Sequence, residues 1–214
     1  MTAPSVHIRS VALFERPVTL RLPFRFGAAT VTRCPQAFVR VTVDVAGQPH
    51  HGASAELMVP KWFDKAPALT HEQNFEQLRE ALRCAREAYG AAGVQPSAYA
   101  LSHTAGEDAI AAAVARGLPR LAAQFGPAQL DKAVADAVLR AVGQPWAAGV
   151  RQGALGDPWS AHLPLHQPAS VTLRHTVGLA DRLVVSDEGA DPQDGLPATL
   201  ADAITAYGLH HFKL

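Results

Sequence analysis

Two pairs of adjacent histidines are the side chains in this sequence that most resemble metal ligands. His50 and His51 form the first pair, and His210 and His211 form the second. Imidazole nitrogens are common ligands of zinc and other transition metals. Neighbouring residues of a strand point to opposite faces, so neither pair can direct both of its rings at one ion. The spacing therefore predicts no metal site at either pair.

Two further groups carry reactive or acidic side chains without the spacing that their chemistry needs. Ser54 lies in the run Gly52-Ala-Ser-Ala-Glu56, which lacks the second glycine of a nucleophile elbow and opens no helix. Four acidic residues cluster near the C-terminal end, without the spacing or the glycine of a calcium loop: Asp187, Glu188, Asp191 and Asp194. We therefore expect that Ser54 is not a hydrolase nucleophile and that the acidic segment 187–194 is a solvated turn.

Composition narrows the class of protein and its partners. The chain has 214 residues, of which 48% are hydrophobic and 18% charged, the range of an ordinary globular protein. Its 19 basic residues balance 19 acidic ones, so no excess of positive charge favours nucleic acid as a partner. No stretch approaches the roughly twenty apolar residues of a membrane span, and the N-terminus lacks a signal-peptide pattern. We expect no membrane partner.

The two cysteines indicate the compartment. Cys34 and Cys84 belong to no CxxC motif, and two isolated cysteines make neither a disulfide framework nor a zinc site. This usage fits a reducing compartment, so we expect the protein to be cytoplasmic.

Extended structure is expected over the first sixty residues. Val6–Phe14, Val18–Phe26 and Ala37–Val45 are rich in valine, threonine, phenylalanine and leucine and alternate with period two. Turn residues separate the segments, which predicts an antiparallel meander of three strands. The alternation in the third segment predicts one covered and one solvated face.

Helices are expected to cover that sheet. Thr70-His-Glu-Gln73 and Thr104-Ala-Gly-Glu107 both have the pattern of a capping box and predict two helix starts. A third helix is expected from Pro127, with Gly143 near its end.

The C-terminal segment predicts a strand, a helix and a second strand. These are Val171–Val177, Pro197–Tyr207 with Gly208 as its stop, and the start of a strand at His210–Leu214. Such a βαβ unit pairs its strands in parallel. The expected fold class is thus α+β, a three-stranded antiparallel meander with a helical segment, followed by one and a half βα units of a barrel.

This order of elements resembles the enolase superfamily, and within it the mandelate racemase/muconate lactonizing enzyme group. The residues that carry the resemblance follow the same order along the chain: Leu22-Pro-Phe-Arg-Phe-Gly27, Phe38-Val-Arg-Val-Thr-Val43 before Gly47, Gly52-Ala-Ser-Ala-Glu56 before Pro60-Lys-Trp-Phe63, Ala133–Gly156, and Phe212-Lys-Leu214. The resemblance implies a capping domain at 1–156, with its helical segment at 70–143, and an incomplete barrel start at 157–214.

The resemblance also implies a chemistry. Enzymes of this group abstract a proton alpha to the carboxylate of a small acid, and Mg²⁺ with cationic side chains stabilises the enediolate. Their second barrel strand carries a Lys-x-Lys motif, and Lys213 matches its first lysine, which helps to hold the substrate carboxylate. The alternative is that Lys213 is a solvated residue. The second lysine and the strands that bring the metal ligands have no counterpart within these 214 residues, so we expect this chain alone to bind no Mg²⁺ and to be inactive.

Two loops of the capping domain close the barrel and select the substrate in this group. By position they correspond to Leu22–Arg33 and Ser54–Lys65. An aromatic ring beside a cation suits an organic acid, because the ring supplies apolar area and the cation meets the carboxylate. The candidate substrate-binding residues of the two loops are Phe24, Arg25, Phe26, Glu56, Lys61 and Trp62. Packing between sheet and helix is the alternative role for the Trp62 region.

Other functions stay open. One alternative is a stand-alone α+β binding or interaction module without catalysis, and another is assembly with a separately encoded remainder of the barrel. The expected assemblies are a homo-oligomer or pairing through the open barrel edge.

Overall fold

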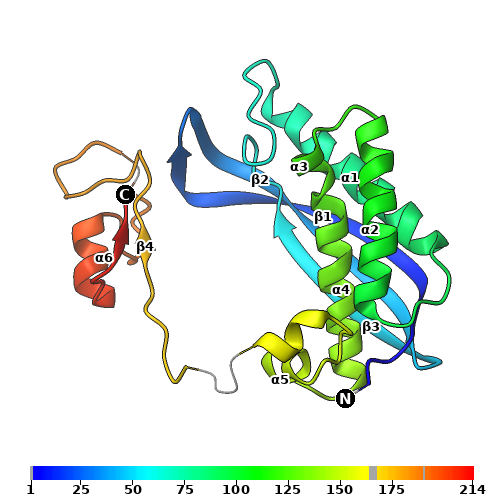
Figure 1. The fold of residues 1–214 in the computed structure, drawn as a ribbon. Coiled ribbons are helices and arrows are strands. Elements are labelled where there is room, and N and C mark those ends of the chain that lie inside the picture. Colours follow the sequence, from blue (N-terminus) through cyan, green and yellow to red (C-terminus); the bar gives the residue numbers. More distant parts are fainter. Residues whose placement is uncertain (1, 164–167, 190) are drawn as a thin grey trace. The chain divides into compact units, whose positions relative to one another are not determined.

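A computed structural model describes residues 2–163, 168–189 and 191–214 (Figure 1). Its elements, in chain order, are β1 (Val6–Phe26), β2 (Ala29–Val45), β3 (Gln48–Leu57), α1 (His71–Ala91), α2 (Ala98–Ala115), α3 (Arg120–Ala123), α4 (Phe125–Ala141), α5 (Trp146–Arg151), the 3-10 helix η1 (Pro158–His162), β4 (His175–Thr176), α6 (Leu200–Tyr207) and β5 (Phe212–Lys213). Within the described ranges, no helix has the length and apolar character to cross a bilayer.

The described chain forms two compact units. The first contains residues 2–16 and 35–163, with β3 and the helices α1 to α5. The second contains residues 17–34, which include the turn between β1 and β2, together with residues 168–189 and 191–214. The expected division into a capping domain at 1–156 and a barrel start at 157–214 stays a prediction.

The first three strands form the predicted antiparallel meander, in the order β1-β2-β3. The pairing of β2 with β3 runs from Val45 opposite Gln48 to Gln36 opposite Leu57. Ala46 and Gly47 connect these strands, with φ angles of 50° and 82°. Two consecutive positive φ angles are the signature of a type I′ hairpin turn, whose twist matches that of the flanking strands.

The strand bounds differ from those expected. Val6–Phe14 and Val18–Phe26 belong to one continuous strand, β1, which runs through Pro17. Because β1 lies at the edge of the sheet, half of its backbone groups have no partner strand, and a proline is tolerated there. The third strand of the meander is Gln48–Leu57, which was not expected because its sequence contains no β-branched residue.

Helices cover one face of the sheet, as predicted. Val39, Val41 and Val43 on β2 are at most 1% exposed. On the helical side, α1 and α4 bury the apolar stripes that contain Leu78 and Leu130. In Figure 1 the helices α1, α2 and α4 lie together in one layer against the sheet.

One of the two predicted capping boxes is present. The backbone N–H of Gln73 donates to Thr70 Oγ1 at 3.2 Å, and the Thr70 N–H donates to Gln73 Oε1 at 2.7 Å. The box at Thr104 was wrong, because α2 begins seven residues earlier, where Ser97 Oγ accepts the Ala100 N–H at 3.1 Å. The Thr104 hydroxyl instead donates to the Ala100 carbonyl inside α2. A threonine in mid-helix satisfies its hydroxyl in this way without opening a new helix.

The second unit contains the predicted parallel βαβ arrangement in a shorter form. His175 pairs with Phe212 and Thr176 with Lys213, so β4 and β5 are parallel. The strand expected over Val171–Val177 is reduced to His175–Thr176, and the helix expected from Pro197 begins at Leu200, after its cap Thr199. Gly208 ends α6 as predicted, with a left-handed φ of 60°.

Candidate functional site

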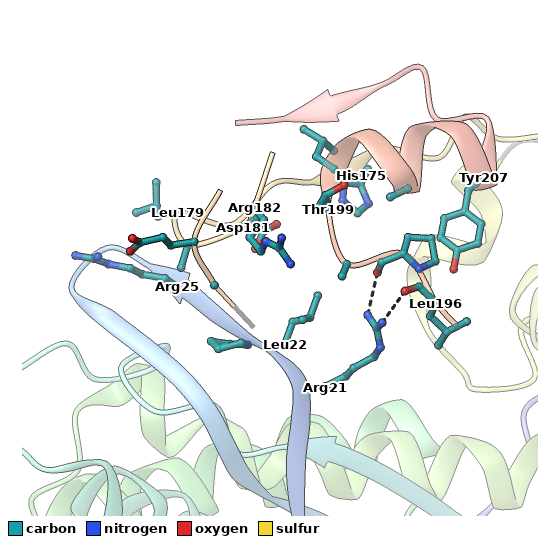
Figure 2. Close-up of a pocket in the computed structure, with 18 residues that line it drawn as sticks. Arg21, Leu22, Arg25, His175, Leu179, Asp181, Arg182, Leu196, Thr199 and Tyr207 are labelled. Carbon is teal, nitrogen blue, oxygen red and sulfur yellow. Dashed lines mark hydrogen bonds between the residues drawn. The ribbon is translucent and has the colours of Figure 1, made fainter. Parts of the chain in front are cut away.

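A cavity of about 710 Å³ lies inside the second unit (Figure 2). Its walls come from the end of β1, from β4, from the segment 179–189 and from residues 196–207 around the start of α6. The strand β1 contributes Arg21, Leu22 and Arg25, which Figure 2 labels together with Arg182 and Thr199; the Arg25 side chain points away from Arg182 in this view. The cavity therefore joins several guanidinium groups to apolar walls.

Arg21 binds residues 194–197, a segment that it contacts from β1. Its Nε and Nη2 atoms each lie 2.6 Å from one oxygen of Asp194, and it also donates to the carbonyls of Leu196 and Pro197 at 2.9 and 3.0 Å. This bidentate ion pair lowers the pKa of Asp194 to about 2, chiefly through the hydrogen bonds from Arg21. Arg21 thus fixes the cavity wall, and its charge is already offset.

One donor atom of Arg182 makes no hydrogen bond to any residue that the structure describes. Its Nε donates to the Asp187 carbonyl at 2.9 Å and its Nη2 to the Val185 carbonyl at 2.7 Å. Its Nη1 lies 3.4 Å from an oxygen of Asp191 and makes no hydrogen bond to any described residue, although the atom is buried. Only 10% of the side chain is exposed. A buried guanidinium N–H without an acceptor is costly, and an anion in the cavity would supply one.

Arg25 lies at the tip of the hairpin. Its carbonyl accepts the Leu179 N–H at 3.0 Å, which attaches the tip to the cavity wall. Its guanidinium is exposed and makes no ion pair or hydrogen bond to another residue in the described ranges. The rings of Phe24 and Phe26, its neighbours in sequence, pack with their centroids 5.6 Å apart. Arg25 is therefore available to meet a ligand.

The acidic and polar groups of the cavity mostly stabilise turns. Asp181 accepts the Gly178 N–H at 2.8 Å, and Thr199 caps α6 by accepting the Asp202 N–H at 3.1 Å. Asp187, from the expected solvated turn, accepts the N–H groups of Leu183 and Val184 and so organises the loop. The cavity thus offers arginine side chains and apolar walls, an arrangement that suits a small organic anion.

Of the residues predicted from the sequence, only Arg25 lines this cavity. Phe24 and Phe26 are the sequence neighbours of Arg25 on β1 and do not line the cavity, and Lys213 is exposed on β5. Glu56, Lys61 and Trp62 belong to the first unit. Their expected roles toward substrate stay predictions.

The contacts in the first unit give Glu56 and Lys61 structural partners. Glu56 forms an ion pair with Lys132 at 3.0 Å. Lys61 has a positive φ of 61°, and its ammonium donates to the carbonyls of Ala66 and Leu69 at 2.6 and 2.5 Å. Trp62 is 54% exposed. Lys61 thus closes the loop that precedes α1.

Two cavity arginines were missed from the sequence. Arg21 could have been found, because it stands four residues before Arg25 and the period of two places both on the same face of a strand. Arg182 lies in a loop and has no comparable pattern around it, since its position depends on the fold of residues 179–189.

No group of three or more histidine, cysteine, aspartate or glutamate side chains among the described residues is arranged to hold a metal ion. Cys34 and Cys84 are both free and buried, and burial raises the pKa of each thiol.

Comparison with known proteins supports the fold. No protein-family model and no curated protein matches the chain. Among solved structures, the chain is similar to an enolase from the alpha proteobacterium bal199 with bound magnesium, with 13% identity and a TM-score of 0.51. The similarity covers 80% of this chain and 38% of the enolase chain. It confirms the predicted fold class.

Two more solved structures align less closely. A protein assigned as a mandelate racemase/muconate lactonizing enzyme from Sorangium cellulosum has 20% identity and a TM-score of 0.42, over 80% of this chain and 38% of that chain. An enolase from Bradyrhizobium complexed with magnesium and mandelic acid has 16% identity and a TM-score of 0.35, over 66% of this chain and 33% of that chain. The chain thus spans well under half the length of all three.

Proposed function

We propose that this chain forms the capping domain and barrel start of an enolase-superfamily enzyme of the mandelate racemase/muconate lactonizing type. Such an enzyme abstracts a proton alpha to the carboxylate of a small acid, with racemisation, elimination or cycloisomerisation as the outcome. The observation that carries the proposal is the similarity to the enolase fold over 80% of this chain. The match to only 38% of the enolase chain agrees with a portion of such an enzyme.

The cavity of the second unit gives this chain a role in substrate binding. The carboxylate of the acid binds at the arginines that line the cavity, Arg25, whose guanidinium is exposed, and Arg182, whose Nη1 has no hydrogen-bond acceptor although it is ion-paired with Asp191. Charge-assisted hydrogen bonds of this kind are about twice as strong as neutral ones. The organic part of the acid contacts Leu22, Leu179 and Leu196 on the cavity wall.

The metal of the family finds no ligand set among the residues described here. Mg²⁺, where an enzyme of this type binds it, stabilises negative charge that develops on the carboxylate oxygens. We propose that the ligands of this metal come from residues outside this chain, and that this chain binds the acid without turning it over. Lys213 is proposed to contact the carboxylate only when the rest of a barrel is present.

Binding of mandelate to the full 214-residue chain tests the cavity. Chemical shifts of the backbone N–H groups would be followed during titration of mandelate and of its neutral amide. We expect saturable shifts for mandelate alone, centred on residues 21–25 and 179–182. The substitution Arg25→Gln should weaken binding by about tenfold, because a charged hydrogen bond contributes about 1.5–3 kcal/mol.

Arg33→Gln is the matched control. Arg33 is an exposed arginine of the same hairpin and does not line the cavity. Its substitution should leave the affinity for mandelate unchanged. Equal affinity of the chain and its Arg25→Gln variant would overturn the proposed role of the cavity. Mg²⁺-dependent exchange of the alpha proton of mandelate for deuterium, catalysed by this chain alone, would overturn the assignment of catalysis to residues outside it.

A further inference from the structure

The first unit contains a second cavity, of about 380 Å³, with aromatic walls. It lies among α2, α4, α5 and η1, and its rings are those of Tyr99, Trp146 and Trp159. Tyr99 and Trp159 meet edge to face, with ring centroids 6.4 Å apart and an interplanar angle of 85°. Trp146 and Trp159 are each 60% exposed, so both present uncovered ring surface. Uncovered indole rings beside a cavity are unfavourable in water and favour a ligand with apolar surface.

An acidic oxygen at this cavity has no partner. Asp157 Oδ1 accepts the Ser160 N–H at 3.0 Å and caps η1. Its Oδ2 is buried and makes no hydrogen bond to any residue that the structure describes. A buried carboxylate oxygen without a donor or a counter-charge is costly, so the negative charge of Asp157 favours a positively charged group in the cavity that this residue lines.

The remaining charges of the cavity are already engaged. Asp131 accepts hydrogen bonds from the hydroxyls of Tyr89 and Ser102 at 2.5 and 2.8 Å. Burial raises the pKa of Asp131, which makes it the weaker candidate for a counter-ion. The cationic Lys132 forms its ion pair with Glu56. The unpaired charge in the cavity is therefore the negative one of Asp157.

We propose that this cavity binds an organic ammonium ion, with the cationic nitrogen on the side of the cavity that Asp157 lines and the apolar part against Trp146 and Trp159. The face of an indole ring attracts cations through its quadrupole, and tryptophan is the strongest of the aromatic residues in this respect. The size of the cavity lies within the usual range for small-molecule sites, about 300–1,000 Å³. This site shares no residue with the carboxylate cavity of the second unit, so each proposal can be tested independently of the other.

Titration with benzyltrimethylammonium tests the proposal on the full chain, with benzyl alcohol as the neutral probe and phenylacetate as the anionic one. Tryptophan fluorescence and the indole N–H signals report binding. We expect benzyltrimethylammonium to bind at least about tenfold more tightly than either of the other probes. Equal binding of the cationic and neutral probes would overturn the proposal, because it would mean a merely apolar surface. Tighter binding of phenylacetate would overturn it as well.

Substitutions distinguish the effect of the Asp157 charge on ligand binding from the role of Asp157 as the cap of η1. Asp157→Ser keeps a side-chain oxygen that can cap η1 and removes the charge. It should weaken binding of benzyltrimethylammonium about tenfold and leave that of benzyl alcohol unchanged. Trp146→Leu should weaken binding of the cation several-fold with an unchanged far-UV circular dichroism spectrum. Trp62→Leu is the control, since Trp62 is similarly exposed but does not line the cavity. Full affinity for the cation in a folded Asp157→Ser variant would overturn the role of Asp157.

Discussion

The contact between β3 and α4 makes Gly52 the most sensitive position of the sheet to a small substitution. A Cβ atom added at Gly52 would lie 2.0 Å from the Ala133 carbonyl oxygen, 2.5 Å from the Ala137 backbone nitrogen and 2.9 Å from the Ala137 Cβ. Two of these atoms belong to the helix backbone, which cannot move aside as a flexible side chain does. Gly52→Ala must therefore push β3 and α4 apart.

The cost of that displacement follows from the contacts that it disturbs. Overpacking a tight interface destabilises a protein by about 1–3 kcal/mol. Two hydrogen bonds cross the same interface, from the Ala53 N–H to Asp136 Oδ2 at 3.0 Å and from Ser54 Oγ to the Gln129 carbonyl at 2.8 Å. Each contributes about 1 kcal/mol. We expect Gly52→Ala to lower the free energy of unfolding by about 3 kcal/mol.

Urea unfolding followed by tryptophan fluorescence measures this effect. All three tryptophans, Trp62, Trp146 and Trp159, belong to the first unit and report its unfolding. With a slope of about 2 kcal/mol per molar urea, the midpoint should fall by about 1.5 M. Gly90→Ala is the control, because a Cβ at Gly90 in α1 meets no atom within 4 Å, and it should raise stability by up to about 1 kcal/mol. A Gly52→Ala midpoint within 0.2 M, roughly, of the parent would refute the reasoning.

Three further predictions concern the caps and two carboxyl groups. Thr70→Ala should lower the free energy of unfolding, measured with urea, by about 1 kcal/mol, because it removes the capping box. Thr104→Ala should change the free energy of unfolding by less than about 0.5 kcal/mol. Equal effects of the two substitutions would contradict the assignment of the caps. Burial raises the folded-state pKa of Asp131, so its contribution to stability is present below the unfolded pKa and is lost as pH rises through the folded pKa. The stability of the parent relative to Asp131→Asn should therefore fall as the pH rises above the ordinary aspartate pKa of about 3.9, and a constant difference would count against burial of the carboxyl. The pKa of Asp194 is shifted in the opposite direction, because Arg21 lowers it to about 2. Carboxyl NMR should therefore show that Asp194 titrates at a lower pH than exposed aspartates. Titration at the pH of an exposed aspartate would mean that the ion pair with Arg21 is not formed.

The fold class was predictable because several local signals agree with one another. The period-two alternation of Ala37–Val45 places Val39, Val41 and Val43 on the covered face. The capping box at Thr70 and the glycine at 208 mark helix ends through local chemistry alone. These features depend on residues within a few positions of each other, so sequence reasoning reaches them.

The features that were missed depend on tertiary context. β3 has little strand propensity, and its pairing with β2 follows from the tight turn at Ala46-Gly47 and from its contact with α4. Arg182 and Asp157 each have one buried polar atom that makes no hydrogen bond, and this atom is the reason that each residue enters the proposals. Whether such an atom is buried and lacks a hydrogen bond depends on the packing of segments that are distant in sequence, so no spacing in the sequence predicts it.

The most direct test of the proposed identity is the coding sequence that follows the codon for Leu214 in the natural gene. We predict that the reading frame continues directly with a lysine, which completes a Lys-x-Lys motif with Lys213 and Leu214. Further βα units should follow, with acidic residues at the ends of their strands. A stop codon directly after Leu214, with no sequence for further βα units downstream, would contradict the assignment of this chain as part of an enolase-superfamily enzyme.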